Sequence, residues 1–374
     1  MREGFIVFFV GTVAEYIKLF PIIEEAKKQS ARFKVIASGQ NEIYGTDIAK
    51  LTNLEINLQL SNEDDIVKNV FGLFYWFFKT MLTSKKKIKN AFEDVDFEKS
   101  IMVVHGDTLS TVMGAVLAKK LKMKLAHVEA GLRSHHLFEP FPEEIDRLVV
   151  SKISDINFCQ GELAALNLAK AKGKVINTKY NTIIDAIDYA KPVQTHNPVF
   201  EKLNGAPYGV FVIHRQENLL KKHLVENIVE KAIEISKDIK IVFVLHQITE
   251  NTLKKFNLYD RLCEQKNIIV TRRMGYFDFT KVLVKSSFVV TDGGSNQEEL
   301  NYIGKPTLVL RYATERNEGL GENAVMYDGD FEMITYFSKN YQNFRREAVK
   351  TDSSPSECIC NYLIDMQKDD NENG

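Results

Sequence analysis

The sequence is poor in cysteine, proline and tryptophan, and it has no excess of charge of either sign. Its 374 residues include four cysteines, eight prolines and one tryptophan, and 49 basic side chains stand against 50 acidic ones, for a net charge of −1. A chain so close to neutral offers no general attraction for nucleic acid, so no nucleic-acid partner is expected. The few cysteines exclude a disulfide framework, and Cys358 and Cys360 have no second pair to complete a zinc site. We therefore expect reduced thiols in a cytoplasmic protein without a metal or other cofactor.

Long hydrophobic runs are also missing. The strongest apolar concentration, residues 70–82 (VFGLFYWFFKTML), is too short to cross a membrane and contains Lys79. The basic run Lys85, Lys86 and Lys87 follows it, which leaves an interfacial membrane helix as an alternative. We interpret the segment instead as a helix buried against another subunit or domain. This interpretation predicts a homodimer with no stable membrane anchor.

Short apolar runs alternate with amphipathic stretches over most of the chain, a rhythm typical of βαβ units in a parallel sheet. The length of the chain favours two domains. Residues 187–207 interrupt the rhythm with prolines, glycine and asparagines, and we predict that they form a linker. The N-terminal Rossmann-like domain is then residues 1–186, the C-terminal nucleotide-binding one is 208–350, and residues 368–374 form a disordered acidic tail. The predicted strands are 5–10, 33–37, 101–105, 124–128, 156–159, 175–177, 208–213, 239–245, 267–270, 287–291 and 306–310.

Polar motifs follow several of the predicted strands of the first domain, where open parallel sheets bind their ligands. The glycine of GTVAEYIK (11–18) permits a tight turn, and free N–H groups at the start of the next helix can hold a phosphate or a sugar hydroxyl. In HGDT (105–108), Asp107 either caps the following helix or takes part in the chemistry of a site. HVEAGLRS (127–134) and PFPEEIDR (140–147) are rich in ionisable side chains. Glu143 and Arg147 share one helix face at i and i+4, so a surface salt bridge between them is the alternative to a site.

The second domain carries similar motifs after its strands. HRQEN (214–218) follows the first strand, and DGGSNQEE (292–299) follows a later one. Small residues at a helix start let backbone N–H groups approach a diphosphate, and a following glutamate can accept hydrogen bonds from ribose hydroxyls. A single histidine is more often structural than catalytic, but His214 lies at the predicted ligand edge. These motifs favour a nucleotide half-site.

The order and spacing of these motifs, with GKP (304–306) and TER (314–316), resemble the non-hydrolysing UDP-N-acetylglucosamine 2-epimerases from about Phe5 to Arg316. The resemblance implies an α/β fold like that of the B-type glycosyltransferases, with two Rossmann-like domains facing across a cleft. It also implies a C-terminal helix, at about 354–367, that packs back on the first domain. The implied enzyme is an isomerase that inverts C2 of a UDP-N-acetylglucosamine-type sugar to the manno isomer. It would eliminate UDP and add it back, and the product would supply surface polysaccharide precursors.

The resemblance implies roles for residues that match the motifs of the family. The implied catalytic residues are three acid/base carboxylates and a histidine on the diphosphate side, namely Asp107, Glu129, Glu143 and His214. The implied substrate-binding residues lie in the sugar pocket, near the uracil, at the diphosphate and at the ribose, and they are Lys18, Arg147, Phe279, Gly293, Gly294, Ser295, Glu299 and Arg316.

Several positions depart from the pattern of the family. Val13 stands where an arginine usually contacts phosphate, and Gly293 stands where serine is usual. Asn41 and Glu42 replace a His-Arg pair that in some bacterial members helps to bind a second, activating UDP-N-acetylglucosamine. These changes favour a divergent member with a different sugar substituent. The alternatives are a hydrolysing 2-epimerase that releases the free N-acetylmannosamine-type sugar and UDP, a glycosyltransferase of the same fold, and a non-catalytic UDP-sugar-binding protein.

Overall fold

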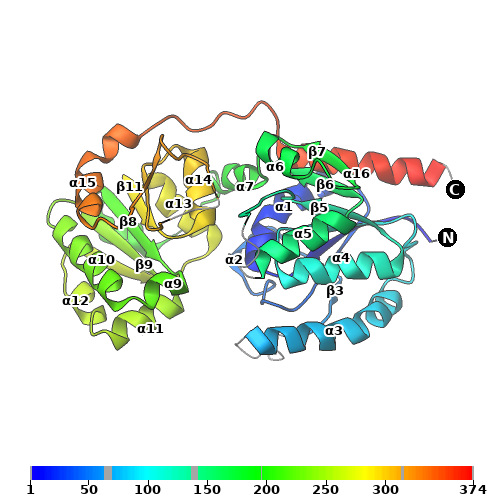
Figure 1. Ribbon diagram of the computed structural model, residues 1–374, viewed down its shortest axis with the longest axis horizontal. Helices are drawn as coiled ribbons and strands as arrows, with labels where there is room; N and C mark the ends of the chain where they lie inside the picture. The colour runs from blue at the N-terminus through cyan, green and yellow to red at the C-terminus, as the bar shows by residue number, and fades with distance from the viewer. Residues whose placement is uncertain (1, 63–69, 136–141, 195, 313–315, 373–374) are drawn as a thin grey trace. The chain divides into compact units, whose positions relative to one another are not determined.

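The computed structural model describes residues 2–62, 70–135, 142–194, 196–312 and 316–372. The chain divides into two compact units (Figure 1). The first unit combines Met1–Tyr189 with Thr351–Gly374, and the second is Ala190–Lys350. Each unit contains one sheet whose named strands all pair in parallel, with helices between successive strands except β12 and β13. The predicted α/β class with two Rossmann-like units is confirmed.

The sheet of the first unit has the strand order β3-β2-β1-β4-β5-β6-β7. Its strands are β1 (Ile6–Val10), β2 (Phe33–Ala37), β3 (Leu58–Gln59), β4 (Ile101–His105), β5 (Lys124–Val128), β6 (Ile156–Cys159) and β7 (Lys174–Asn177). Its helices are α1 (Val13–Lys28), α2 (Asp47–Leu51), α3 (Val70–Ala91), α4 (Leu109–Leu121), α5 (Glu143–Ile153), α6 (Gly161–Asn167), α7 (Ile183–Ala190) and α16 (Pro355–Glu372). The strand order reverses between β1 and β4, and a doubly wound sheet binds its ligands at the carboxyl ends of the strands at such a point.

The central strands of the first sheet are apolar because helices cover both of its faces. All five residues of β1 and of β4 are buried. Thr12 is the N-cap of helix α1: its hydroxyl accepts a hydrogen bond from the Glu15 N–H, while the Glu15 carboxylate accepts one from the Thr12 N–H. This capping box fixes the turn between β1 and α1.

The sheet of the second unit has the order β10-β9-β8-β11-β12-β13 and reverses between β8 and β11. Its strands are β8 (Tyr208–Ile213), β9 (Lys240–Leu245), β10 (Ile268–Arg272), β11 (Phe288–Thr291), β12 (Thr307–Val309) and β13 (Ala324–Met326). Its helices are α8 (Pro198–Leu203), α9 (Gln216–Leu219), α10 (Lys222–Ile235), α11 (Gln247–Lys255), α12 (Tyr259–Cys263), α13 (Tyr276–Lys285), α14 (Gly294–Ile303) and α15 (Glu332–Asn340), and Tyr341–Phe344 is a 3-10 turn.

The segment predicted as a linker, residues 187–207, is partly helical. Helix α7 extends into it as far as Ala190, and α8 occupies Pro198–Leu203. The Asn197 side chain caps α8 by accepting a hydrogen bond from the Val199 N–H, and Pro198 takes the first helical position. Proline is favoured there because the first N–H of a helix has no intrahelical partner. Pro198 therefore begins a helix, whereas Pro192 follows the end of α7.

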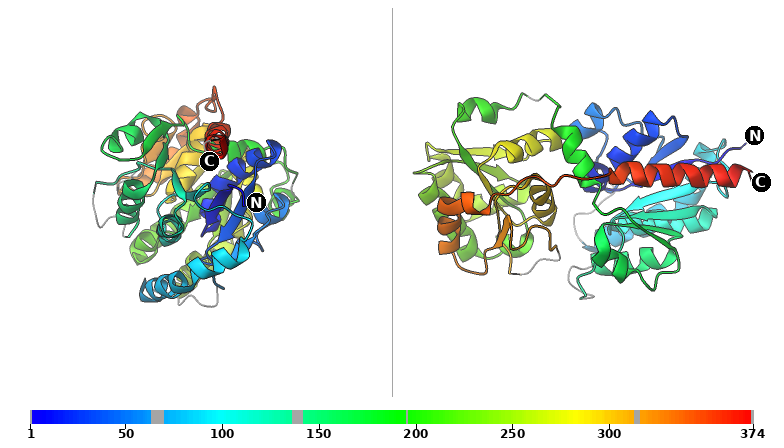
Figure 2. Two further views of the ribbon diagram at one scale, coloured as in Figure 1. Left: turned by 90° about the vertical axis from the view of Figure 1, so that its right-hand side faces the viewer. Right: turned by 90° about the horizontal axis from the view of Figure 1, so that it is seen from above.

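The C-terminal helix α16 belongs to the first unit and packs on α1. It runs from Pro355 to Glu372, beyond the predicted end at 367 and into the segment predicted to be disordered. The sequence 356–372 has no glycine or proline that would stop a helix. Gln367 donates from Nε2 to the Gly4 carbonyl at 2.6 Å. The first and last segments of the chain lie side by side (Figure 2).

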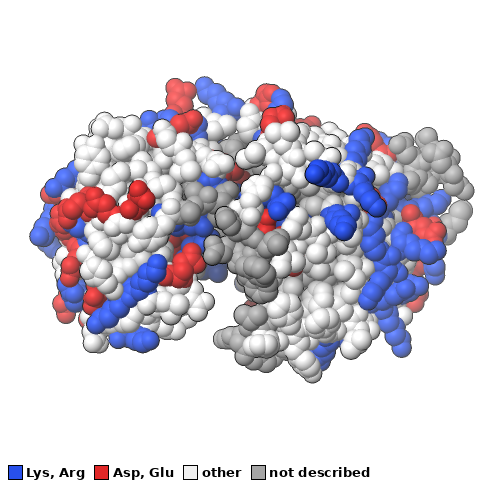
Figure 3. Space-filling view, viewed as in Figure 1, with Lys and Arg blue, Asp and Glu red and all other residues white. Residues whose placement is uncertain are grey.

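The apolar segment 70–82 lies in α3. Trp76 and Ile88 of this helix are buried in the core, but Phe71, Tyr75, Phe78 and Leu82 are 87%, 66%, 64% and 85% exposed. Their spacing of four, three and four residues places them in one stripe along the helix. Basic side chains gather over the ends of α3 and α4 on the face shown in Figure 3. The lysines Lys85, Lys86 and Lys89 of α3 are exposed. Among the described residues, no helix has the length and apolar character needed to cross a membrane.

Candidate active site

The motifs of the first unit meet at the carboxyl ends of β1, β4 and β5, which are neighbours in the sheet. Gly11 follows β1, Asp107 lies two residues after β4, and Glu129 follows β5. The strand order therefore brings together side chains that are separated by about a third of the chain. This edge is the ligand edge of a doubly wound sheet.

Glu129 is held by a buried ion pair. Lys18 of α1 places Nζ 2.5 Å from Oε2 of Glu129, and Nε2 of His105 lies 3.0 Å from the same oxygen. All three residues are less than a tenth exposed. Burial lowers the pKa of His105, so its imidazole is neutral near pH 7 and the lysine supplies the positive charge. The result is a buried carboxylate with a cation beside it, and such a group can serve as a general base.

The backbone of Glu129 is unusual. Its φ is +64°, in the left-handed region that a residue with a side chain seldom adopts. The next N–H, of Ala130, donates to the Phe158 carbonyl at 2.9 Å, and Gly131 also has a positive φ of +85°. A Cβ at Gly131 would lie 2.3 Å from the Ala164 carbonyl oxygen, so only glycine fits. The surrounding chain thus holds the carboxylate in a conformation that costs about 1 kcal/mol or more, as active-site residues often do.

Asp107 and Arg147 form the second ion pair of this site. Nη2 of Arg147 lies 2.5 Å from Oδ2 of Asp107, and Nη1 lies 3.4 Å from Oε2 of the fully buried Glu144. Glu144 also accepts hydrogen bonds from Nε of Arg133 at 2.5 Å and from the Ser134 N–H at 3.0 Å. The structure thus pairs Arg147 with Asp107 and Glu144, and not with Glu143 in the i, i+4 pair that was the alternative reading of the sequence. The ion pair with Asp107 places the Arg147 guanidinium at the carboxyl edge of the sheet.

Glu143 is the first residue of α5. Its Oε2 is buried and has no hydrogen-bond partner among the described residues. A buried polar atom without a partner is costly, so this oxygen is suited to meet a group of a ligand. Pro140 and Phe141, which precede this helix in the PFPEEIDR motif, lie outside the described residues.

Glu15 belongs to the site and is absent from the predicted set. Its Oε2 accepts hydrogen bonds from the N–H groups of Gly11 at 2.6 Å and Thr12 at 3.2 Å, and its Oε1 accepts one from the Thr108 hydroxyl at 2.5 Å. Glu15 therefore joins the loop after β1 to the loop that carries Asp107. Burial raises the pKa of Glu15 to about 7. The capping-box pattern Thr12-x-x-Glu15 is the sequence signal that could have identified it.

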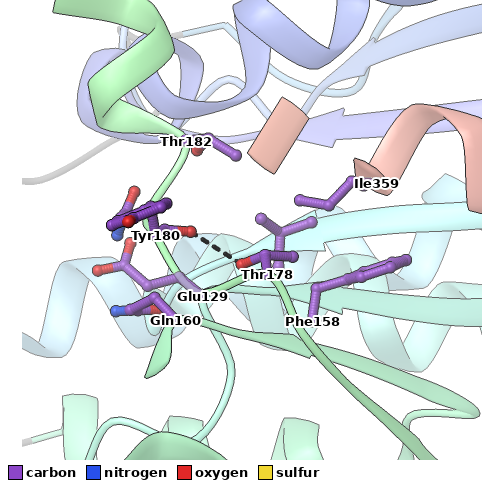
Figure 4. A pocket seen from close by; sticks show the side chains of 9 residues that line it. Glu129, Phe158, Gln160, Thr178, Tyr180, Thr182 and Ile359 are labelled. Atoms are coloured by element: carbon purple, nitrogen blue, oxygen red, sulfur yellow. Dashed lines mark hydrogen bonds between the residues drawn. The ribbon is translucent and has the colours of Figure 1, made fainter. Parts of the chain in front are cut away.

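A pocket beside Glu129 lies wholly within the first unit (Figure 4). Glu129, Gln160 and Tyr180 lie together at one end of it, and Phe158 and Ile359 line the other. Nε2 of Gln160 and Oγ1 of Thr182 are buried without hydrogen-bond partners among the described residues. A pocket with an apolar wall and free polar groups suits a small polar ligand group.

In the second unit, Asp292 organises the loop that carries His214. The fully buried carboxylate accepts hydrogen bonds from the N–H groups of His214 and Arg215, both at 3.0 Å, and from Nδ2 of Asn218 at 3.1 Å. The His214 ring stacks on His246, with centroids 4.5 Å apart and planes 14° apart. Burial lowers the pKa of both histidines, that of His246 to about 4. His246 and Asp292 were not among the predicted site residues, because the stack and the buried carboxylate depend on which strands are neighbours.

Gly293, Gly294 and Ser295 form the start of α14. Gly293 is the N-cap and makes no side-chain capping hydrogen bond. A Cβ at Gly293 would lie 2.9 Å from Cε1 of His214, so the glycine backbone lies directly beside that ring. A helix start of this kind presents N–H groups and the positive end of the helix dipole to an anion.

The remaining predicted residues of the second unit lie on or near α13 and α14. Glu299 is buried on α14, and Phe279 of α13 is half-buried against the hydrophobic core. Arg316 is buried, and its Nη1 lies 2.5 Å from Oε2 of Glu298. Its backbone carbonyl accepts a hydrogen bond from Nε2 of Gln297 at 3.0 Å. Thr314 and Glu315 of the TER motif lie outside the described residues.

Comparison with known proteins gives these motifs one family. The family model of UDP-N-acetylglucosamine 2-epimerase matches residues 24–348. The chain is 33% identical over 331 residues to the UDP-N-acetylglucosamine 2-epimerase of Methanocaldococcus jannaschii, with 86% of this chain and 87% of that protein covered. It is 30% identical over 339 residues to the enzyme of that name from Campylobacter jejuni, with 85% and 84% covered.

A solved structure agrees with the sequence matches. The crystal structure of the Methanocaldococcus jannaschii UDP-GlcNAc 2-epimerase in complex with UDP-GlcNAc and UDP is similar with a TM-score of 0.77. The two are 29% identical, and the similarity covers 97% of this chain and 99% of that chain. The expected B-type glycosyltransferase-like fold class is thereby confirmed. Because the family model and the relatives each match most of the chain, this chain belongs to the UDP-N-acetylglucosamine 2-epimerase family.

Proposed function

We propose that the chain inverts C2 of UDP-N-acetylglucosamine, or of a UDP-sugar close to it, to give the manno isomer without hydrolysis. The observation that carries this proposal is the presence of Asp107 and Glu129 at one sheet edge, each held by its own cation. Inversion at a carbon that bears hydrogen requires one group to take a proton and another to return one on the opposite face.

The proposed reaction has two stages. A carboxylate first removes the C2 proton while the C1–O bond to UDP breaks. This step leaves free UDP and a sugar with a double bond between C1 and C2. A carboxyl group then gives a proton to C2 from the other face as UDP adds back to C1, so that atoms and charge balance. In this proposal Asp107, Glu129 and Glu143 supply the acid and base groups, with Lys18 and Arg147 beside them.

The second unit is proposed to hold the UDP. The diphosphate needs positive potential and N–H donors when it leaves. The start of α14 at Gly293, Gly294 and Ser295 supplies the donors, and His214 lies beside Gly293. Glu299 would accept hydrogen bonds from the ribose, Phe279 would lie near the uracil, and Arg316 would complete the nucleotide site.

Proton NMR in D2O tests this function directly. The purified chain is incubated with UDP-N-acetylglucosamine, and the UDP-sugar is recovered. Deuterium at C2 and appearance of the manno isomer are expected. Free sugar and UDP as the main products would show hydrolysis, and an unchanged but bound UDP-sugar would show a non-catalytic binding protein.

We also propose a homodimer that buries the stripe Phe71, Tyr75, Phe78 and Leu82 of α3. Four large apolar side chains in one exposed stripe are unusual on a monomer and suit an isologous contact with a second copy.

We propose a cytoplasmic location for the chain. All four cysteines are free thiols, which supports a reducing, cytoplasmic setting. The product would supply precursors of a surface polysaccharide.

A further inference from the structure

Asp146 of α5 has no role in the mechanism described so far. It lies one helical turn after Glu143, on the same face of the helix. Asp146 is only 6% exposed, and its Oδ2 is buried without a hydrogen-bond partner among the described residues. A buried carboxyl oxygen with no donor is not explained by helix stability, because aspartate has low helix propensity and usually needs a partner when buried.

The site has more acidic than basic side chains. The described part of the first unit places six carboxyl groups and three cationic side chains at this site. The carboxyl groups are Glu15, Asp107, Glu129, Glu143, Glu144 and Asp146, and the cations are Lys18, Arg133 and Arg147. A buried charge without a counter-ion is costly, so the carboxyl groups that lack a cation are those that should hold protons.

The ion pairs show which carboxyl groups these are. Glu129 pairs with Lys18, Asp107 pairs with Arg147, and Glu144 pairs with Arg133. Arg147 follows Asp146 in sequence, but its guanidinium is directed to Asp107 and Glu144. No described cation forms an ion pair with Asp146, Glu143 or Glu15, so these three are the carboxyl groups of the site without a cation.

Its surroundings favour the protonated form. Burial, with added repulsion from Asp107 and Glu143, raises the pKa of Asp146 to about 7. Helix α5 packs on α4 and β5. The charged residues of α4, Lys119 and Lys120, are exposed in its last turn. The end of β5 carries His127 and Glu129, the neighbouring end of β4 carries His105 and Asp107, and α5 itself carries Glu143, Glu144 and Arg147. Burial lowers the pKa of His105 and of His127, so neither imidazole supplies a charge near neutral pH.

We propose that Asp146 is a positioning residue of this active site, which must stay uncharged beside Glu143 and Asp107 for the enzyme to turn over. The inference rests on the proposed function. The substrate brings a diphosphate, and C2 gains negative charge as its proton leaves. An ionised, unpaired Asp146 would add a further negative charge next to the acid and base groups and oppose that step. Loss of the Asp146 proton therefore sets an alkaline limit on activity.

The protonation of Asp146 can be measured without any assay of activity. The full chain is labelled with 13C at the aspartate carboxyl carbons, and the carboxyl resonances are followed by NMR as a function of pH. A resonance with a midpoint near pH 7 is expected in the wild type and should be missing in Asp146→Asn. The proposal is overturned if no aspartate resonance titrates near neutral pH, or if that resonance persists in the variant. Asp146→Ser serves the same purpose if the asparagine variant does not fold.

The effect on turnover is measured as the ratio of kcat at about pH 8.5 to kcat at about pH 6. This ratio should be about tenfold or more higher in Asp146→Asn than in the wild type, because the asparagine side chain cannot ionise. Asp146→Glu, which can ionise, should keep an alkaline limb. Asp238→Asn, in an exposed turn, is the matched control and should keep the wild-type ratio. An unchanged ratio in a folded Asp146→Asn, or loss of turnover at both pH values, overturns the positioning role. Absence of turnover in the wild type would instead contradict the proposed function, while the NMR titration would still decide the state of Asp146.

Discussion

Arg147 lies 2.5 Å from Asp107, and this ion pair joins helix α5 to the loop after β4. Arg147 is 7% exposed, and its other contact, Glu144, is fully buried. The Asp107 carboxylate is therefore oriented by a buried partner, while a quarter of its side chain remains accessible, at 26%. A carboxylate that is oriented, paired with a cation and reachable is suited to proton transfer.

Asp107→Asn should lower kcat about 10²-fold or more, because the amide cannot take or give the proton. Circular dichroism and the unfolding midpoint should show that the fold is kept. Asp238→Asn, which makes the same chemical change in an exposed turn, is the control. Wild-type turnover by a folded Asp107→Asn would refute the assignment.

Lys18→Met should lower the free energy of unfolding by about 3 kcal/mol, because it leaves the buried Glu129 carboxylate without its ammonium partner. The double variant Lys18→Met, Glu129→Gln should regain part of the loss. Urea unfolding measures all three. Lys28→Met is the control, since Lys28 pairs with Glu25 at the surface and its side chain is 72% exposed. The prediction fails if the single and double variants are equally destabilised.

Glu15 should make stability depend on pH. Its pKa is about 7 in the folded protein against an ordinary 4.5, so between these values the folded state holds more protons than the unfolded state. The contribution of Glu15 is therefore full below pH 4.5 and is lost as the pH rises to 7. The unfolding free energy of the wild type minus that of Glu15→Gln should fall by about 3 kcal/mol over this range.

This difference is measured by urea unfolding at several pH values. Glu55→Gln, at an exposed position of the same unit, should show a constant difference from the wild type. A constant difference for Glu15→Gln as well would mean that Glu15 ionises normally in the folded state.

Phe78→Glu should convert a dimer to a monomer, because a charge in the α3 stripe would be buried in the contact. Sedimentation velocity measures the change. Tyr336→Glu is the control, since Tyr336 is an exposed aromatic residue of the second unit. A wild-type monomer that binds anionic liposomes through α3 would favour the membrane alternative instead.

We expect no activation by UDP-N-acetylglucosamine. Asn41 and Glu42 replace the His-Arg pair that helps to bind the activator in some bacterial relatives, and both are exposed. A carboxylate facing a diphosphate would oppose binding by about 1 kcal/mol or more. Initial rates with the manno-configured UDP-sugar alone should show no lag. A lag that trace UDP-N-acetylglucosamine abolishes would show that the activating site survives.

Much of the fold could be predicted from apolar periodicity. The segment 124–128 matches β5 residue for residue, and 208–213 matches β8. Strands β3 and β13 escaped prediction because they have two and three residues, too few for a pattern. The end of α16 was misplaced because the acidic tail suggests disorder, whereas no glycine or proline up to Glu372 stops the helix.

The candidate site was also predicted only in part from the sequence. Residues inside recognisable motifs, such as Asp107 and Glu129, could be proposed from the sequence alone. The partners of these residues could not, because strand order decides that His105 meets Glu129 and that Arg147 meets Asp107 instead of Glu143. Asp146 was passed over because its lack of a partner is visible only once every neighbour is placed.

Helix α16 also has a consequence for biosynthesis. The first unit takes this helix from the end of the chain, whereas the second unit is encoded without interruption between the two parts. A ribosome therefore synthesises every residue of the second unit before it reaches the helix that packs on α1. The first unit can cover this side of α1 only after the whole second unit has been made. Until then the α16-facing side of α1 has no intramolecular partner.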